Sequence, residues 1–285
     1  MILPDFITAD FETNVGAIQT AEFVTGGDIN QGAKITTKND LTFFVKWHEN
    51  APPNMFAAEA YGLTLLADTN TLHIPECVYQ NEHCLILMWL EMGERQSQIV
   101  AQVLGEGLAY LHQSGASQYG LDQNNFCGLT LQINTWHDNW VDFFINCRLQ
   151  PQISLAERYN RLSISRGKKL NHLLKQLPNL LPANPPISLL HGDLWGGNWI
   201  VTKNGQPALI DPAVYYGHRE ADLAFTELFG GFSSQFYQAY QTIWPLEAGY
   251  EERKRIYNLY HLLNHLNLFG EGYGGSVDGV LNRFV

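Results

Sequence analysis

The stretch that decides the fold reads HGDLWGGN at residues 191–198 and is followed by LID at residues 209–211. Short apolar segments flank both parts, at residues 187–190 and 199–202, and such segments are typical of buried strands. Asn204-Gly205, between the apolar segments at residues 199–202 and 208–210, predicts a two-residue hairpin turn. In that register Asn198 and Asp211 are direct cross-strand partners, with Cβ atoms about 5 Å apart.

The side chains of this hairpin point to phosphoryl transfer. The amide oxygen of Asn198 and the carboxylate of Asp211 form a hard-oxygen pair suited to Mg²⁺. Asp193, on the irregular loop beside them, is placed to take a proton from a substrate hydroxyl. Each residue alone could be a turn former or a strand cap, but the joint spacing favours a site. We expect His191 to bond to the backbone, with a metal-ligand role as a weaker alternative.

A kinase also needs a cation on the nucleotide phosphates, and Lys46 lies within the otherwise apolar strand at residues 41–47. Glu59, on the helix expected over residues 55–68, can supply the carboxylate that holds this lysine toward the phosphates. A surface Lys and a surface Glu remain the alternative. Gly26 and Gly27 could cover the phosphates with backbone N–H groups, although the segment also fits an ordinary hairpin turn.

The periodicity changes along the chain and predicts two lobes. Residues 20–25, 29–37, 41–47 and 84–89 read as strands, whereas later stretches repeat apolar residues at spacings of three and four. Helices are expected over 98–113, 220–229 and 250–269, and from a capping box at Ser154 and Glu157. The Gly-rich tail at 270–279 reads as a loop. We therefore expect an α+β fold with an N-terminal lobe over residues 1–90 and a mostly helical lobe over 91–285.

Composition excludes several classes of protein. The 285 residues carry a net charge of −11, which argues against general nucleic-acid binding. The longest apolar run, residues 84–90, is far shorter than the roughly 20 residues of a membrane span. The four cysteines lack metal-site spacing and read as reduced thiols. The first 14 residues lack a basic start, so we expect a cytoplasmic protein.

These motifs resemble the aminoglycoside phosphotransferase and choline kinase superfamily of protein-kinase-like folds, and within it the fructosamine kinases. The resemblance runs through nearly the whole chain. Trp195 within HGDLWGGN makes it specific, together with the tail motif YHLLNH at residues 260–265. Three further motifs fit the family pattern: IDPA at 210–213, READLA at 219–224 and LFGGF at 228–232. The family phosphorylates the 3-hydroxyl of ketosamines, the sugar adducts of amines. Many bacterial members are assigned as ribulosamine or erythrulosamine kinases that repair glycated protein.

The resemblance implies ATP and Mg²⁺ as cofactors and a role for each site residue. It makes Asp193 the catalytic base, Asn198 and Asp211 the Mg²⁺ ligands, and Lys46 with Glu59 the phosphate clamp. The resemblance also implies Met88, Trp89 and Leu90 as the adenine hinge and Asp222 as a brace of the catalytic loop. From the residues themselves we expect Gly26 and Gly27 over the phosphates, Trp195 as a flat face for the sugar and His265 in the substrate pocket.

Some points stay open at this level. Many relatives carry Cys where Asp28 stands, which puts a thiol switch at that turn in doubt, and the hinge position often held by an acid is Met88. His261 and His265 lie one helical turn apart and could pack, bind substrate or form a zinc pair. An antibiotic or choline-type kinase is the rival within the fold, and a non-catalytic nucleotide-binding module is the rival in another class. The particular ketosamine and the oligomeric state are not indicated.

Overall fold

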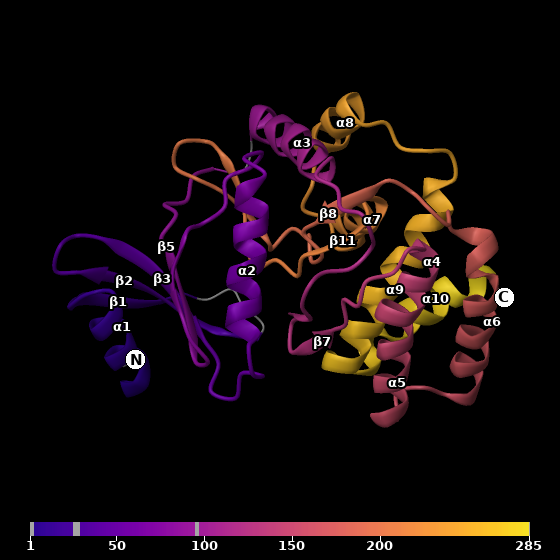
Figure 1. Cartoon of the computed structure of the whole chain (residues 1–285), viewed down its shortest axis with the longest axis horizontal. Coiled ribbons are helices and arrows are strands. Elements are labelled where there is room, and N and C mark those ends of the chain that lie inside the picture. Colours follow the sequence, from indigo (N-terminus) through magenta and orange to yellow (C-terminus); the bar gives the residue numbers. More distant parts are fainter. Residues whose placement is uncertain (1–2, 25–28, 95–96, 285) are drawn as a thin grey trace.

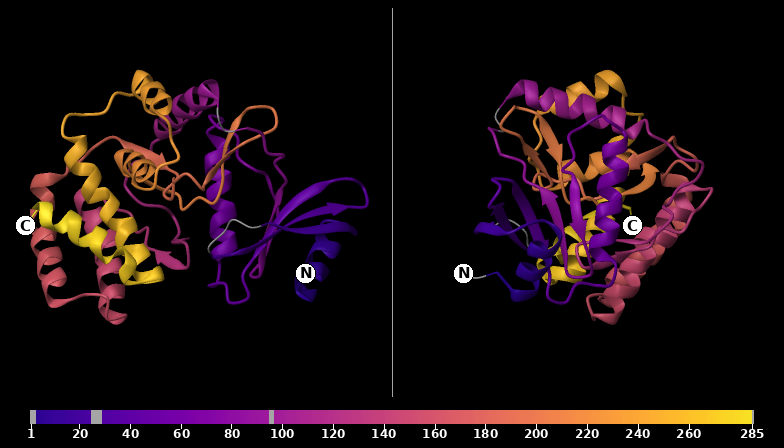
Figure 2. Two further views of the ribbon diagram at one scale, coloured as in Figure 1. Left: turned by 180° about the vertical axis from the view of Figure 1, so that it is seen from behind. Right: turned by 60° about the vertical axis from the view of Figure 1, so that its left-hand side comes forward.

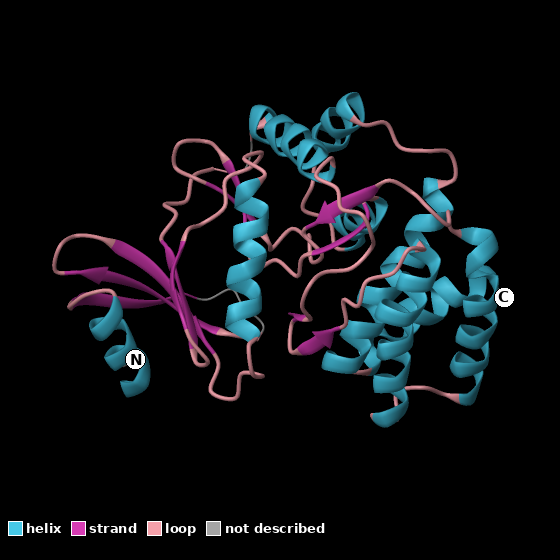
Figure 3. Cartoon of the chain, in the orientation of Figure 1, coloured by secondary structure: helices cyan, strands magenta, loops and turns pink. Residues whose placement is uncertain are grey.

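The computed structural model describes residues 3–24, 29–94 and 97–284. A β-sheet with two helices lies at the N-terminal end of the molecule, and a larger, mostly helical part lies at the C-terminal end (Figures 1 and 3). Figure 2 shows the same separation from two other sides. The predicted α+β arrangement is therefore present. Within the described residues, no helix combines the length and apolarity that crossing a membrane requires.

The N-terminal part is built on an antiparallel sheet with strand order β1-β2-β3-β5-β4. The strands are β1 Ile18–Val24, β2 Gln31–Thr37, β3 Thr42–Trp47, β4 Cys77–Gln80 and β5 Cys84–Met88. The predicted strands match four of these with small shifts at their ends. Helix α1, Asp5–Asn14, and strand β4 were not predicted, because neither shows a strong periodicity.

The two faces of the sheet are covered by different helices. Phe43, Val45 and Trp47 on β3 pack toward α1, whereas Leu85 and Leu87 on β5 pack toward helix α2, Met55–Asp68. Successive side chains of a strand point to opposite faces. Lys46 therefore faces α2, although both of its neighbours in the chain are buried against α1.

The C-terminal part is dominated by helices. They are α3 Gln98–His112, α4 Trp140–Phe143, α5 Gln150–Arg158, α6 Ile164–Leu180, α7 Glu220–Leu228, α8 Ser234–Ile243, α9 Tyr250–Phe269 and α10 Gly274–Phe284. A π-helical turn, Phe144–Leu149, joins α4 to α5, and a 3₁₀ turn, Glu271–Tyr273, precedes α10. One large apolar core lies among α4, α5, α6, α9 and α10, and a second surrounds α3 and α8.

Two helix expectations are wrong. Ser154 does not start a helix, because it lies inside α5, and the next helix begins after Ser163, whose Oγ accepts a hydrogen bond from the Arg166 N–H at 3.1 Å. The Gly-rich tail is helical, because Val277 and Leu281, four residues apart, are buried against the main core. Tertiary packing outweighs the low helix propensity of glycine there.

Three short antiparallel pairs complete the C-terminal part, namely β6 Asn125–Cys127 with β7 Thr130–Gln132, β8 Ile187–Leu190 with β11 Tyr215–His218, and β9 Trp199–Val201 with β10 Pro207–Leu209. The predicted register of the last pair is wrong by one residue. Val201 faces Pro207, and the Ile210 N–H donates to the Asn198 carbonyl at 3.1 Å. Asn198 therefore faces Ile210, not Asp211. The loop has three residues and ends at Gly205, whose φ of +76° suits glycine.

Close packing of α3 on α8 requires a small residue at position 105. A Cβ on Gly105 would overlap the backbone carbonyl of Phe236. We expect Gly105→Ala to destabilise the protein by about 1–3 kcal/mol, the usual cost of overpacking. Gly279→Ala on the open face of α10, where nothing lies within 4 Å, should stabilise by about 0.5–1 kcal/mol. Thermal unfolding of both variants checks this; equal shifts of the melting temperature would contradict the packing at Gly105.

Candidate active site

The catalytic loop, residues 191–198, connects β8 to β9 and turns sharply at its second residue. Gly192 has φ of +81°, and a Cβ there would overlap the carbonyl oxygen of Ala213. His191 Nε2 lies 2.9 Å from the Ile210 carbonyl, while the Asp193 N–H donates to His191 Nδ1 at 3.3 Å. The two contacts fix the imidazole as a neutral, backbone-bonded group, which confirms the structural role expected for His191.

Asp222 holds this loop from the first turn of α7. Its carboxylate accepts the backbone N–H of His191 at 2.7 Å and that of Gly192 at 2.9 Å. His112 Nε2 lies 3.2 Å from the same carboxylate. The group is only 2% exposed, so these bonds compensate for burying its charge. The expectation that Asp222 braces the catalytic loop is confirmed.

Asp193 emerges from the loop with one edge open. Its side chain is 22% exposed. Asn198 Nδ2 donates to the Asp193 carbonyl at 2.8 Å and to its Oδ2 at 3.1 Å. Burial, with the nearby charge of Asp211, raises the pKa of Asp193 to about 8, against the lowering effect of hydrogen bonds from Cys127 and Asn198. A carboxyl group with a pKa near neutrality suits a general base.

Lys46 joins the two parts of the molecule. Its Nζ lies 2.7 Å from Glu59 Oε2 on α2 and 2.9 Å from Asp211 Oδ1. Burial alone would lower the pKa of Lys46, but the two carboxylates outweigh it and raise the pKa above its ordinary value. The lysine is therefore charged, and the predicted pair with Glu59 is present. A buried cation between two acidic groups can be shared with phosphate oxygens.

Asn198 and Asp211 lie together at the open end of the β9–β10 hairpin, although its register differs by one residue from the predicted one. Asp211 adopts φ of +54°, which turns its side chain out of the strand, and this side chain is 43% exposed. Asn198 Nδ2 is directed at Asp193 and at the Asp211 carbonyl, so the amide oxygen is the end that can face a cation. An exposed carboxylate oxygen and an amide oxygen fit the hard-oxygen donors that Mg²⁺ requires.

The hinge residues are partly engaged by the sheet. The Met88 N–H donates to the Glu76 carbonyl at 2.9 Å, and the Trp89 N–H donates to the Thr42 carbonyl at 3.1 Å. A nucleobase therefore cannot use these two amides without breaking sheet contacts. Of the three predicted hinge residues, only Leu90 can offer a backbone N–H, and all three can still offer carbonyls.

The remaining predicted residues fall in different places. Gly26, Gly27 and the neighbouring Asp28 lie outside the described residues. Trp195 is half-buried, with its indole ring against the Cα of Gly197. His265 is half-buried among aromatic rings, with ring centroids 5.1 Å from Phe229 and 5.0 Å from Tyr273, and its Nδ1 lies 2.8 Å from the His261 carbonyl.

Two residues that face the base were not among the predicted site residues. Cys127, at the end of β6, places Sγ 3.6 Å from Asp193 Oδ1. His261, on α9, places Nδ1 3.8 Å from the same oxygen. For His261 the sequence left packing, substrate binding and a zinc pair with His265 open, whereas a lone cysteine in an irregular region gives no signal.

The tail motif acts by holding β6 and β7 beside the catalytic loop. Tyr260 donates its hydroxyl to Gln132 Oε1 at 2.8 Å, and Gln132 Nε2 donates to the Ala213 carbonyl at 2.9 Å. Asn264 Nδ2 donates to the Cys127 carbonyl at 3.2 Å. Gly231 of LFGGF serves the same loop, because a Cβ on Gly231 would lie 2.6 Å from the Cα of Gly196.

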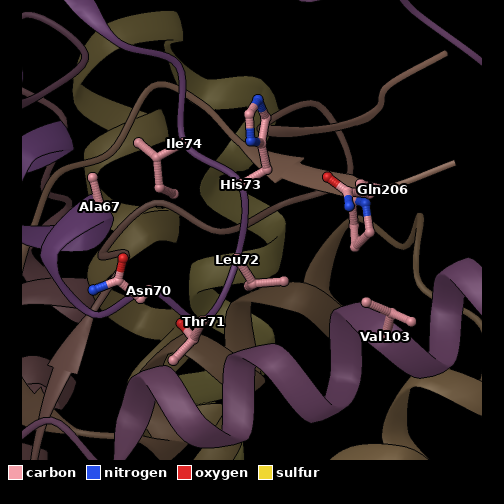
Figure 4. A pocket seen from close by; sticks show the side chains of 9 residues that line it. Ala67, Asn70, Thr71, Leu72, His73, Ile74, Val103 and Gln206 are labelled. Carbon is pink, nitrogen blue, oxygen red and sulfur yellow. The ribbon is translucent and has the colours of Figure 1, made fainter. Parts of the chain in front are cut away.

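A separate hollow of about 410 Å³ lies between the end of α2, α3 and the β9–β10 hairpin (Figure 4). Asn70, His73 and Gln206 give it a polar lining, and Leu72 and Val103 contribute apolar surface. None of its lining residues is a predicted site residue, so it is distinct from the site around Asp193.

Comparisons with known proteins agree with this geometry. The fructosamine kinase family model matches residues 6–285. A probable ketoamine kinase of Synechocystis sp. is 44% identical over 271 residues, covering 93% of this chain and 90% of that protein. The chain belongs to the fructosamine kinase family. Fructosamine kinases are phosphotransferases, so this protein is a kinase.

Further fructosamine kinase relatives extend the comparison. A chloroplastic protein-ribulosamine 3-kinase of Arabidopsis thaliana is 36% identical over 271 residues, covering 92% of this chain and 81% of that protein. A crystal structure from Thermobifida fusca, assigned as a fructosamine-3-kinase, matches with a TM-score of 0.89 at 26% identity, covering 98% of each chain. A choline kinase from Streptococcus pneumoniae matches with a TM-score of 0.68 at 17% identity, over 98% of this chain and 97% of that one, which shows the shared fold alone. The predicted protein-kinase-like fold is confirmed.

The brace on the catalytic loop of this fructosamine kinase can be tested with Asp222→Asn. The amide offers one acceptor where the carboxylate offers two, so a buried N–H of the loop loses its partner at a cost of about 1–3 kcal/mol. We expect a lower melting temperature and a kcat reduced at least about tenfold, because Asp193 is displaced. Asp278→Asn, in a peripheral ion pair with Arg166, is the control. Normal turnover in folded Asp222→Asn would contradict the brace.

Proposed function

We propose that this protein is an ATP- and Mg²⁺-dependent ketosamine 3-kinase that phosphorylates the sugar 3-hydroxyl of ribulosamines, erythrulosamines or fructosamines, and thereby serves protein deglycation. The observation that carries the proposal is the convergence of Asp193, Asn198 and Asp211 with Lys46 across the two parts of the chain. The names of the ketoamine and ribulosamine kinase relatives support the substrate class.

Each step is assigned to a residue of this chain. Asp193 accepts the proton of the attacking sugar hydroxyl from its exposed edge. Lys46, held by Glu59, shares its charge with the nucleotide phosphates. Asn198 and Asp211 would hold Mg²⁺, which neutralises charge on the transferred phosphoryl group when bound. The backbone of residues 88–90 would meet adenine through carbonyls and the Leu90 N–H.

On this proposal the chain has two functional lobes. We assign residues 1–90 to nucleotide binding and residues 91–285 to catalysis and substrate binding, since Lys46 and Glu59 lie in the first and the base in the second. The strongly acidic chain suits a ketosamine whose amine is protonated. An antibiotic or choline-type substrate is the alternative within this fold, and we disfavour it because Trp195 lies in the catalytic loop.

A screen for ADP release tests the proposal directly. The purified protein is given ATP, Mg²⁺ and one of three lysine adducts, made with ribulose, erythrulose or fructose. We expect turnover with at least one adduct and none with free lysine. Turnover only with choline or an aminoglycoside would support the alternative, and nucleotide-induced thermal stabilisation without any turnover would indicate a non-catalytic binding module.

Substitution of the base tests the role of Asp193. Asp193→Asn keeps the shape of the side chain and one of its two acceptor oxygens, but it cannot take the hydroxyl proton. We expect turnover to fall by about two to four orders of magnitude, the usual share of general-base catalysis. ATP affinity, measured by calorimetry, should change little. Near-normal turnover in the folded variant would remove Asp193 from the reaction.

Substitution of Trp195 tests substrate selection. Trp195 lies two residues after the proposed base, where its ring can border the acceptor, so Trp195→Ala should lower kcat/KM for a ribulosamine by about 5- to 30-fold, a stacking loss of roughly 1–2 kcal/mol. The KM for ATP should stay nearly constant. Equal losses for both substrates together with a large drop in melting temperature would make Trp195 a packing residue instead.

A further inference from the structure

We propose that Cys127, Asp193 and His261 form an inhibitory zinc site that disables the catalytic base when Zn²⁺ binds. The inhibition rests on the proposed function, whereas binding of the metal does not. The three ligand atoms, Sγ, a carboxylate oxygen and an imidazole nitrogen, all lie within 4.8 Å of one another. Thiolate, carboxylate and imidazole are the three kinds of ligand that zinc takes in proteins.

The separations suit one small tetrahedral ion. Cys127 Sγ lies 3.6 Å from Asp193 Oδ1, and His261 Nδ1 lies 3.8 Å from the same oxygen. Zinc bonds of about 2.0–2.3 Å place neighbouring tetrahedral ligands roughly 3.3–3.7 Å apart. Small side-chain movements would therefore bring the three atoms onto one ion. The fourth position would face the exposed edge of Asp193 and hold water.

His261 provides the strongest support for the site. The residue is only 5% exposed, and its Nδ1 has no hydrogen-bond partner although it is directed at Asp193. Its ring is fixed by stacking on Phe225 with centroids 3.6 Å apart. Burial holds the pKa of His261 well below its usual value, so the imidazole is neutral and able to ligate. A buried, oriented and unpaired ring nitrogen is a costly feature unless something binds it.

Cys127 has the support that a metal-bound thiolate needs. Asn264 Nδ2 donates to its Sγ at 3.3 Å, and such bonds from outside the coordination shell orient ligands and tune their affinity. The thiol is protonated when no metal is bound, because burial and Asp193 raise its pKa. Metal binding forms the Zn–S bond and releases the thiol proton to solvent, with no change in oxidation state.

Zinc would block catalysis because it binds Asp193 Oδ1, an oxygen of the proposed base. Asp193 is the only one of the three with substantial exposure, so the metal would enter along the acceptor side of the site. A Zn²⁺ ion bound to Oδ1 occupies a lone pair and neutralises the carboxylate. Asp193 could then no longer accept the hydroxyl proton, and excess zinc would stop turnover until a zinc-selective chelator removed it.

Cobalt titration of the full-length protein tests the site without using activity. Co²⁺ occupies zinc sites and gives a thiolate-to-metal charge-transfer absorption in the near ultraviolet. We expect this band in the wild type, its loss in Cys127→Ser and His261→Ala, and its retention in Cys147→Ser. Cys147 is the matched control because it is also buried but lies beside His137, with Sγ 3.9 Å from Nδ1. Melting curves verify that each variant folds.

Zinc inhibition of ketosamine phosphorylation completes the test. The zinc concentration for half-inhibition, measured relative to each variant's own activity, should rise at least about tenfold in Cys127→Ser, since even supporting groups contribute 10- to 100-fold to affinity. Absence of the cobalt band, or its persistence in Cys127→Ser or His261→Ala, would overturn the site. A wild-type band without any ketosamine turnover would keep the metal site and reject the proposed function instead.

Discussion

The site depends on one buried carboxylate that accepts two consecutive backbone N–H groups. Asp222 fixes His191 and Gly192, and Asp193 follows directly after the left-handed glycine with one edge exposed. Charge-assisted bonds to backbone are strong and directional in a protein interior. The loop therefore does not rely on its own flexible residues for its shape. Surrounding motifs reinforce it, since the tail motif holds β6 and β7 beside it and Gly231 allows the backbone at Gly196 to approach closely.

The second constraint is the alternation of side chains along β3. It places Lys46 on the face of α2, where Glu59 holds it, and within reach of Asp211 from the other part of the chain. Lys46, buried between two carboxylates, thus couples the groups that we assign to nucleotide binding with those that we assign to catalysis. Removing either carboxylate would leave the buried charge of Lys46 poorly compensated, which lowers the stability of the fold by several kcal/mol. This coupling explains why residues more than 160 positions apart form one site.

Much of this arrangement could be predicted from local sequence. The spacing of HGD, Asn198 and Asp211 indicated the chemistry, and apolar alternation located most strands. The hairpin register could not be predicted, because Asn204-Gly205 fits both a two-residue turn and a three-residue loop ending at Gly205. The helical tail depends on burial of Val277 and Leu281 against distant helices, which outweighs its glycines. Cys127 reaches the base only through long-range packing of β6, so no local pattern could reveal it.

The position of the transferred phosphate tests the central claim most directly. A ribulosamine labelled with ¹³C throughout its sugar is incubated with ATP, Mg²⁺ and the wild-type protein, and the product is examined by ¹³C and ³¹P NMR. The account predicts one product whose phosphorus couples through oxygen to C3, formed with one ADP per phosphate and absent with Asp193→Asn. A phosphate on another carbon, or ADP formed without any phosphorylated sugar from every ketosamine offered, would contradict it.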